Sequence, residues 1–273
     1  MKVSILGAGA FGEALGKILS YNGHETKYYD PIKFPNISLD EAISDTEIII
    51  YAAPSDQHQN ILPQLPKNMH LICASKGFLS LKPFSDFSSF SALGGAAFAD
   101  DITAQEKSIT LTASSEISEN LFSTEKISIE YTKDTFGIML CGALKNIYAI
   151  GAGLYGESGQ EKPEKDTDIS KLMPYLTTVA SEMQELLQAN HADAKTLRLS
   201  CGIADLVLSC SPESRNFSFG QALKNHQAAK ENTTTEGLSV IKSLSEYPDF
   251  IIPDSATTLK DIIAQVQNYI ANL

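Results

Sequence analysis

Residues 2–12, KVSILGAGAFG, decide the fold class of this chain. An apolar run typical of a buried strand leads into Gly7, Gly9 and Gly12, and an amphipathic helical stretch follows. A GxGxxG motif between a strand and a helix is typical of a unit that binds a dinucleotide. Gly7 allows the tight turn, Gly9 lets a pyrophosphate approach the backbone, and Gly12 lets the helix pack closely on the strand. The start of the helix adds N–H donors and a favourable dipole for phosphate.

Asp30 lies 18 residues beyond Gly12, at the end of the next expected strand. A carboxylate there accepts hydrogen bonds from the adenosine ribose and repels a ribose 2′-phosphate, and no arginine lies nearby in the sequence. The sequence therefore favours NAD over NADP as the cofactor, although a turn residue before Pro31 would also explain the aspartate. The candidate cofactor residues of this region are Gly7, Gly9, Ala10, Phe11, Gly12 and Asp30.

The first half of the chain alternates short apolar or β-branched runs with helical stretches. The expected strands are residues 2–6, 25–29, 47–51, 70–74, 90–93, 108–113 and 127–131. Several, such as Ile48–Tyr51, are apolar on both faces, as buried parallel strands are. The expected helices between them include residues 9–21, 39–44 and 57–65. We predict a doubly wound, Rossmann-type α/β domain over residues 1–131.

After residue 131 the pattern changes to helical periodicity with almost no strand signal. The expected helices are residues 136–155, 169–189, 196–210, 219–224, 235–245 and 257–272. The polar segment ESGQEKPEKDTD at 157–168 is expected to be an exposed loop. We therefore predict an all-helical second domain over residues 132–273.

The composition excludes several classes of partner. The chain has 273 residues, 33 acidic and 21 basic, and a net charge of −12. A bound nucleic acid needs a basic footprint and an anionic membrane attracts basic segments, so neither is expected. Four cysteines lie singly in apolar sequence without CxxC spacing, which indicates buried thiols rather than a metal site or disulfides. Glycines and charges interrupt the apolar N-terminus, so we expect no export signal and a soluble cytoplasmic protein.

Two apolar stretches each contain a single charged residue. Between residues 135 and 156 it is Lys145, and between 199 and 212 it is Asp205. An isolated buried charge is costly, so each is expected to meet a partner, and they are candidates for each other. Burial lowers the pKa of a lysine, which suits a general acid or base, and a nearby aspartate opposes that shift and orients the amine. A structural ion pair, or a lysine reaching solvent, would give the same pattern. Lys145 and Asn146 near the middle of the first stretch argue against a membrane span.

Only two of the basic residues are arginines, Arg198 and Arg215. Arg215 lies in Ser214-Arg215-Asn216, where the arginine fork suits a phosphate and the neighbours add neutral donors, although a surface loop explains the triplet about as well. Lys76, in ASKG after the strand at 70–74, would lie at the carboxyl edge of the sheet, where open α/β folds bind ligands.

Taken together, these motifs resemble those of the NAD(P)-dependent glycerol-3-phosphate dehydrogenases, in the same order over most of the chain. The matching stretches are GAGAFG (7–12), Pro54-Ser55, ASKG (74–77), GALKNIYAIGAG (142–153), GIADLVLSCSPESRNFSFG (202–220) and TTTEG (233–237). The resemblance implies a dinucleotide-binding domain joined to an all-helical substrate-binding domain. It also implies reversible hydride transfer between NAD(P)H and C2 of dihydroxyacetone phosphate, giving sn-glycerol 3-phosphate, a phospholipid precursor. Members of this family are often dimers.

The same resemblance implies roles for individual residues. Lys145 is expected to be the general acid/base that protonates the C2 alkoxide, Lys76 a second active-site lysine, and Asp205 the group that orients Lys145. The expected substrate contacts are Asn146, Ser209, Ser214, Arg215 and Asn216, with Arg215 and Asn216 resembling a phosphate clamp. Pro54 and Glu236 are expected beside the cofactor.

Departures from the family pattern leave two other interpretations open. The usual GPSFA-like motif reads GGAAFA (94–99), the segment at 30–39 is short, and Thr178-Val179 stands where an Arg-Gly pair is usual. One alternative is another β-hydroxyacid-type reductase similar to ketopantoate reductase, against which GALKN and Arg215-Asn216 argue. The other is a relative that binds a dinucleotide without turnover, which the departures favour.

Overall fold

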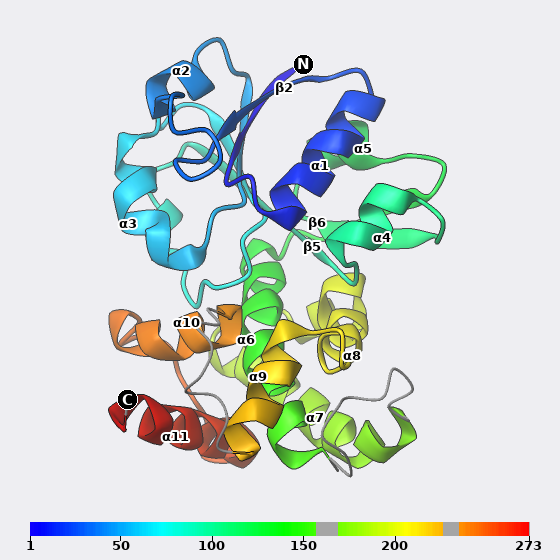
Figure 1. The fold of residues 1–273 in the computed structure, drawn as a ribbon, viewed down its shortest axis with the longest axis vertical. Helices are drawn as coiled ribbons and strands as arrows, with labels where there is room; N and C mark the ends of the chain where they lie inside the picture. Colours follow the sequence, from blue (N-terminus) through cyan, green and yellow to red (C-terminus); the bar gives the residue numbers. More distant parts are fainter. Residues whose placement is uncertain (157–168, 226–234, 273) are drawn as a thin grey trace.

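The computed structural model describes residues 1–156, 169–225 and 235–272. The loop expected at 157–168 and the first two residues of TTTEG lie outside the described residues. Figure 1 shows a sheet with flanking helices, built from the first half of the chain, above a group of helices from the second half. The expected fold class, a Rossmann-type sheet followed by helices, is confirmed.

Seven strands of the described residues form one sheet in the order β2-β1-β3-β4-β5-β6-β7. They are β1 (Lys2–Leu6), β2 (Glu25–Tyr29), β3 (Ile48–Tyr51), β4 (His70–Cys73), β5 (Ser89–Gly95), β6 (Ile109–Ala113) and β7 (Ile127–Tyr131). Neighbouring strands are parallel except β5 and β6, which are antiparallel. The expected ranges agree with the strands to within two residues, but β6 and β7 run opposite to the other five strands, which departs from a fully parallel sheet.

Helices cover both faces of the sheet (Figure 1). One face packs against α1 (Ala10–Tyr21), α4 (Ala99–Ala104) and α5 (Ile117–Phe122). The other packs against α2 (Leu39–Ile43), α3 (His58–Ile61), the turn η3 (Lys82–Phe84) and the start of the long helix α6. The helix expected at 57–65 is divided into η1 (Ser55–Gln57), α3 and η2 (Leu62–Gln64). Pro63, which has no N–H to continue an α-helix, lies in the last of these.

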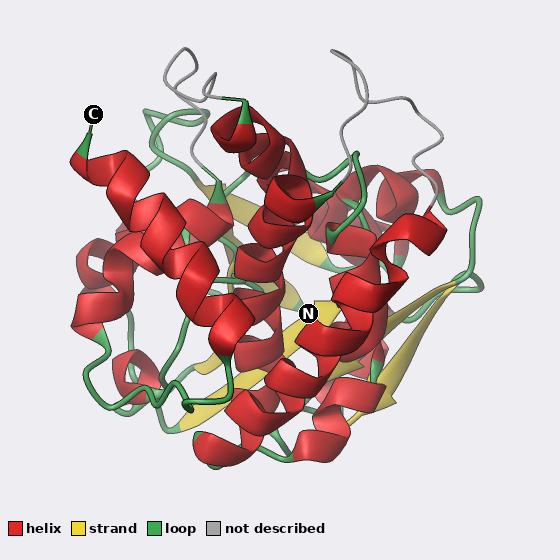
Figure 2. Cartoon of the chain, turned by 90° about the horizontal axis from the view of Figure 1, so that it is seen from below, coloured by secondary structure: helices red, strands yellow, loops and turns green. Residues whose placement is uncertain are grey.

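The second half is built around α6 (Thr135–Tyr155). The elements around it are η4 (Ile169–Leu172), α7 (Met173–Ala189), η5 (Ala194–Arg198), α8 (Asp205–Ser209), α9 (Arg215–Lys224), α10 (Glu236–Ser243), η8 (Leu244–Glu246) and α11 (Thr257–Ala271). Figure 2 shows the helices of this half in front of the strands. Asp134 begins α6: one carboxylate oxygen accepts from Gly137 N at 2.9 Å and the other from Thr196 Oγ1 at 2.6 Å. Among the described helices α6 alone is long and apolar enough to cross a membrane, and its apolar window is wholly buried inside the protein.

The prediction of one continuous helix over residues 196–210 is wrong, because the structure has three shorter elements there. After η5 comes a π-helical turn, η6 (Ser200–Ala204), and α8 begins only at Asp205. Gly202 has φ −94° and ψ −113°, outside the helical region, and a Cβ there would lie 2.1 Å from the carbonyl oxygen of Leu197. The backbone N–H groups of Ser200 and Cys201 donate to side chains of β7 and β6 instead of continuing a helix. Hydrogen bonds to the sheet therefore hold this segment, and α8 begins later than a continuous helix would.

The four cysteines all lie in the described part of the chain. Cys73, Cys141, Cys201 and Cys210 are buried and form no disulfide. Burial raises the pKa of the Cys73 and Cys210 thiols to about 12. The expectation of buried, reduced thiols is confirmed.

Candidate active site

Three charged side chains meet where the carboxyl edge of the sheet faces the central helix. Asp205 lies between two lysines: one carboxylate oxygen accepts a hydrogen bond from Lys145 Nζ, and the other lies 3.4 Å from Lys76 Nζ. The Lys145 and Asp205 side chains are 5% and 2% exposed, whereas that of Lys76 is 19% exposed. The predicted pairing of Lys145 with Asp205 is confirmed, and Lys145 does not reach solvent.

Each member of this cluster comes from a different element. Lys76 follows β4 at its carboxyl end, Lys145 lies in the middle of α6, and Asp205 is the first residue of α8. The break at Gly202 makes Asp205 the start of a new helix. The cluster is thus built from the segment after β4 at the sheet edge and from two helices of the second half.

The environment of Lys145 tunes its proton affinity. Burial lowers the pKa of Lys145 from its ordinary value of 10.5 to about 7. Asp205 opposes this change because it favours the ammonium, and Lys76 adds to it by charge repulsion. Lys145 is therefore partly protonated at neutral pH, so it can both donate and accept a proton there.

A chain of side-chain amides holds the cluster in place. Asn146 Nδ2 donates to the carbonyl oxygens of Lys76 at 3.1 Å and of Gly142 at 3.0 Å, and Asn146 Oδ1 accepts from Asn216 Nδ2 at 3.0 Å. Asn216 Oδ1 accepts from Gly237 N at 3.0 Å. Both amide hydrogens of Asn146 are used in these contacts, whereas within the described residues Asn216 uses one of its two. Asn146 therefore fixes the backbone of Lys76, and the amides join the sheet edge to α9 and α10.

The other expected substrate residues lie on neighbouring turns. Ser209 ends α8 and is buried, and Ser214 is the buried N-cap of α9. The Ser214 side chain makes no capping bond, so it does not satisfy the first amides of α9. Arg215 is the exposed first residue of that helix. Uncapped amides and a guanidinium at one helix start are suited to an anion.

Glu236 is the first residue of α10, and its Oε2 is buried without a hydrogen-bond partner among the described residues. Burial raises the pKa of this carboxyl, and Asp56 adds to the effect, while Arg215, Lys76 and Lys145 oppose it. Leaving a buried acceptor unpaired is costly, so this oxygen is suited to a ligand that donates a hydrogen bond.

The Pro54-Ser55 turn lies beside Gly77 and the Glu236 carboxylate. Pro54 precedes η1, and Ser55 is buried so closely against Gly77 that a Cβ on Gly77 would lie 2.0 Å from Ser55 Oγ. The same Cβ would lie 3.3 Å from Glu236 Oε2. Pro54, Ser55 and Glu236 therefore border one small region beside Lys76. Ser75 Oγ is also buried and unpaired within the described residues, and the sequence did not single it out.

The glycine loop has the geometry that its motif predicts. Gly7 has φ +104°, and a Cβ there would lie 2.5 Å from the backbone N of Ala53. A Cβ on Gly12 would lie 2.0 Å from the carbonyl oxygen of Gly7, so the fold itself requires these two glycines. Gly9 differs, since a Cβ there would meet nothing within 4 Å. Gly9 is the N-cap of α1 and no side chain caps the helix, so open space borders free amides where a pyrophosphate fits.

Phe11, in the first turn of α1, connects this loop to the cluster. Lys76 Nζ lies 5.0 Å from the centroid of the Phe11 ring, within range of a cation–π contact. The ring thus gives the partly exposed lysine a partner on the side of the glycine loop.

Asp30 follows β2 and supports the glycine loop. Its Oδ2 accepts from Ala8 N at 2.9 Å, and its Oδ1 accepts from the amides of Ile32 and Lys33 at 3.0 Å each. Partial burial favours the neutral carboxyl, but the three amides outweigh it and lower the pKa of Asp30. Lys33 was not among the residues expected here, and its Nζ lies 2.7 Å from Glu13 Oε1. The sequence could have indicated Lys33, because it lies only three residues after Asp30.

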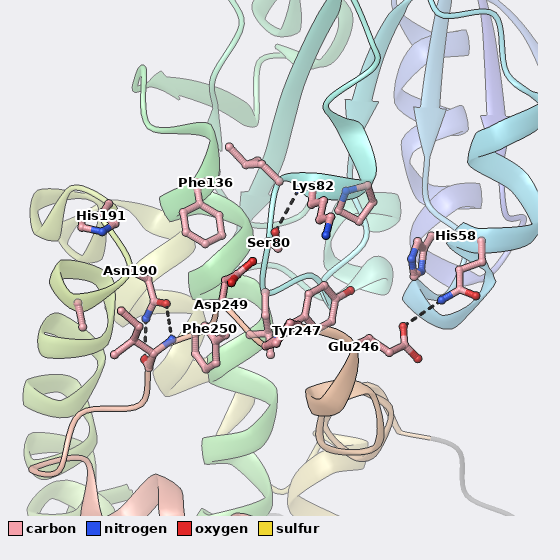
Figure 3. A pocket seen from close by; sticks show the side chains of 17 residues that line it. His58, Ser80, Lys82, Phe136, Asn190, His191, Glu246, Tyr247, Asp249 and Phe250 are labelled. Carbon is pink, nitrogen blue, oxygen red and sulfur yellow. Dashed lines mark hydrogen bonds between the residues drawn. The ribbon is translucent and has the colours of Figure 1, made fainter.

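A cavity of about 600 Å³ lies elsewhere at the junction of the two halves (Figure 3). Phe136, Tyr247 and Phe250 supply much of its apolar lining, and none of the three cluster residues borders it. Lys82, Glu246 and Asp249 all line it, so two carboxylates face one ammonium and the lining does not suit a phosphorylated substrate. The chemistry is therefore assigned to the charged cluster and not to this cavity.

The departures from the family pattern leave the cluster intact. Gly94 and Gly95 end β5, and Phe98 precedes α4. Thr178 is exposed on the unbroken helix α7, where its hydroxyl donates to the carbonyl oxygen of Pro174 at 3.2 Å. None of these residues takes the place of Lys76, Lys145 or Asp205.

A family model and two relatives with similar sequences carry closely related names. A model of the family described as "NAD-dependent glycerol-3-phosphate dehydrogenase C-terminus" matches residues 134–252. A glycerol-3-phosphate dehydrogenase (NAD(P)+) from Ehrlichia canis is 30% identical over 298 residues, which cover 89% of this chain and 89% of the relative. One from Teredinibacter turnerae is 24% identical over 298 residues, covering 91% and 86%.

A solved structure of glycerol-3-phosphate dehydrogenase from Coxiella burnetii has the same fold. It aligns over 98% of this chain and 98% of its own, with a TM-score of 0.75 and 20% sequence identity.

Proposed function

This chain belongs to the NAD(P)-dependent glycerol-3-phosphate dehydrogenase family, and we propose that it reversibly reduces dihydroxyacetone phosphate to sn-glycerol 3-phosphate with NADH. The observation that carries this proposal is the buried Asp205 between Lys145 and Lys76. Reduction of a ketone needs a proton donor at its oxygen and fixed positive charge around that oxygen. This cluster supplies both.

We place the cofactor on residues 1–131 and the substrate mainly on residues 132–273, with the cluster between them. The glycine loop and the amides of Ala10 and Phe11 suit the pyrophosphate, and Asp30 keeps one acceptor site for a ribose hydroxyl. Pro54 and the unpaired oxygen of Glu236 lie beside Lys76, where they suit the nicotinamide end. When bound, the reduced nicotinamide supplies the hydride that reaches C2 of the substrate.

Lys145 is the proton donor in this proposal. Its ammonium form donates a proton to the C2 oxygen as negative charge develops there, and in the reverse direction its neutral form accepts the hydroxyl proton. The lowered pKa of about 7 makes both forms accessible at neutral pH. Asp205 orients the amine and keeps enough positive charge on it for the reduction.

Lys76 stabilises the same developing charge. It is the more exposed lysine and is held by Asp205, by the ring of Phe11 and by the bond from Asn146 to its carbonyl oxygen. A fixed ammonium costs no reorganisation when the charge forms, which is how electrostatic catalysis works. Asn146 acts mainly on the position of Lys76, because both of its amide hydrogens are already bonded to protein.

The phosphate group of the substrate is assigned to the start of α9. Arg215 and the uncapped amides of that helix suit a phosphate, and Asn216 retains one amide hydrogen for it. Ser214 and Ser209 add buried hydroxyl groups on the adjoining turns. Binding energy from the phosphate, which does not react, orients the ketone.

We also propose a cytoplasmic enzyme that forms a homodimer, has no nucleic-acid or membrane partner, and supplies glycerol 3-phosphate for phospholipid synthesis. The net charge of −12 supports the absence of polyanionic partners. Sedimentation equilibrium of the purified protein measures the dimer directly.

The central test follows NADH oxidation with dihydroxyacetone phosphate, ketopantoate, unphosphorylated dihydroxyacetone, or no substrate. We expect rapid oxidation only with dihydroxyacetone phosphate. Turnover of ketopantoate alone would support the other reductase. Tight NADH binding by fluorescence without turnover of any ketone would support a non-catalytic dinucleotide-binding protein and overturn the proposal.

A further inference from the structure

An ion pair stands at the opening of the glycine loop, beside the end of β2. Lys33 Nζ lies 2.7 Å from Glu13 Oε1, and the two side chains are 44% and 45% exposed. Glu13 lies in the first turn of α1, and Lys33 comes three residues after Asp30. In Rossmann-type folds the adenosine ribose lies between these two elements, beyond the carboxyl end of β2.

Asp30 is less of a barrier to a 2′-phosphate than its position in the sequence suggests. A carboxylate has about four acceptor sites, and three of those on Asp30 are taken by backbone amides. These amides partly offset its negative charge, and Lys33 lies close enough to favour the ionised form. One acceptor site on Oδ2 remains for a ribose hydroxyl. Asp30 alone therefore discriminates weakly between a hydroxyl and a phosphate at the 2′ position.

We propose that Glu13 and Lys33 together set the choice between NAD(H) and NADP(H), Lys33 as the cation that receives a 2′-phosphate and Glu13 as the anion that holds Lys33 away from it. The inference rests on the proposed function only in placing a dinucleotide on the glycine loop. NAD(H) binds with the ion pair intact. NADP(H) binds only when the 2′-phosphate replaces Glu13 as the partner of Lys33, so Glu13 favours NAD(H).

The experiment compares two fragments of the cofactor that differ only in the 2′-phosphate. Binding of 5′-AMP and 2′,5′-ADP to the full chain is measured by isothermal titration calorimetry, with no substrate and no turnover. Glu13→Gln should tighten 2′,5′-ADP about two- to fivefold, the range that an exposed ion pair supplies. Lys33→Met should weaken 2′,5′-ADP about tenfold, as expected for one charge-assisted phosphate contact. The affinity for 5′-AMP should stay within about twofold in both variants, since neither side chain is assigned to the ribose hydroxyls or the adenine.

The double variant separates competition for Lys33 from simple repulsion. If Glu13 acts by holding Lys33, Glu13→Gln should give no gain in the Lys33→Met background. Lys17→Met is the matched control, because it removes one positive charge from the exposed face of α1 one turn beyond Glu13. It should leave the ratio of the two affinities within about twofold.

Three outcomes would overturn the inference. They are an unchanged affinity ratio in Lys33→Met, an equal loss in Lys17→Met, or a full gain from Glu13→Gln without Lys33. Failure of the proposed function is separate, because an inactive protein that binds both fragments still reports on this pair. A protein that binds neither fragment contradicts the placement of the cofactor, and with it the inference.

Discussion

Replacing Asp205 by asparagine tests whether the cluster tunes a catalytic proton or only joins two domains. The asparagine keeps the size and one oxygen of the side chain but removes the charge between Lys145 and Lys76. Lys145 then keeps its burial and its repulsion from Lys76, both of which lower its pKa, and loses the partner that raises it.

The size of the effect follows from the electrostatics of the pair. Two unit charges about 4 Å apart interact by about 4 kcal/mol at an effective dielectric constant of about 20, which is roughly a thousandfold in proton affinity. The amide dipole and solvent recover part of this, so we expect a loss of about a hundredfold, which takes the pKa of Lys145 from about 7 to about 5. The protonated fraction at pH 7 then falls from about one half to about one in a hundred, and reduction slows about 50-fold.

The assay is the pH dependence of kcat/KM for dihydroxyacetone phosphate reduction. Reduction needs the ammonium, so the wild-type rate should fall as the pH rises through about 7. In the Asp205→Asn variant the fall should begin about two pH units lower, so that activity recovers in acid. NADH affinity, measured by fluorescence, should not change.

Asp249→Asn is the matched control, because Asp249 is exposed in the separate cavity and faces no member of the cluster. It should keep the wild-type profile. A slower Asp205→Asn enzyme whose rate still falls near pH 7 would refute the reasoning, since Asp205 would then act only on structure.

Three further sets of substitutions test separate parts of the site. Arg215→Gln should lower kcat/KM for dihydroxyacetone phosphate about 10- to 150-fold, the loss of about 1.5–3 kcal/mol expected for one charged phosphate contact, and spare unphosphorylated dihydroxyacetone. Arg198→Gln, the same change at the other arginine, should be neutral in steady-state kinetics, and equal losses at both would contradict the phosphate assignment. Gly9→Ala should keep the melting temperature within about 2 °C but weaken NADH binding roughly tenfold, because its Cβ meets no protein atom and enters the space assigned to the pyrophosphate. Gly12→Ala should instead unfold at a lower temperature, because its Cβ would lie 2.0 Å from a backbone oxygen, and an unchanged melting temperature would show that helix and strand have room. Lys145→Met should abolish turnover with NADH affinity intact. Relative to that variant, the wild-type free energy of unfolding should rise between pH 7 and 10, because the unfolded chain keeps the lysine proton up to about 10.5 while the folded chain releases it near 7, and parallel curves in urea titrations would argue against the lowered pKa.

The strands were predictable because the buried strands are runs of mostly apolar or β-branched residues in the sequence. Ile48–Tyr51 is buried at every position, and such a run has few alternatives to a central strand. The short helices α4 and α5, six residues each, are not among the expected ranges, although the shorter α2 is. The reversed direction of β6 and β7 was also not predictable, since the same apolar pattern fits a buried strand running either way.

Local charge patterns predicted the centre of the site but not its border. Lys145 and Asp205 could be paired because each is the single charge in an apolar stretch, and burial makes a partner necessary. The pair of Glu13 and Lys33 could not be found in that way, because both side chains are about half exposed, where a charge needs no partner. The hydrogen bonds that Asn146 accepts from Asn216 and donates to Lys76 were equally hard to predict, since they join residues 70 positions apart.

The clearest error in the helical half lies at the site itself, and its cause is physical. The stretch at 196–210 has helical periodicity, and a continuous helix would satisfy its own backbone. The protein instead gives the amides of Ser200 and Cys201 to the sheet and bends the chain at Gly202, where the carbonyl oxygen of Leu197 leaves no room for a side chain. A continuous helix would fix the direction of the Asp205 side chain by its position in that helix alone. Instead α8 starts at Asp205, three residues after this bend, and the carboxylate lies between Lys145 and Lys76, which follows β4 at the edge of the same sheet. Helical periodicity therefore gives a wrong prediction at the segment where contacts from both halves of the molecule fix the position of the Asp205 carboxylate.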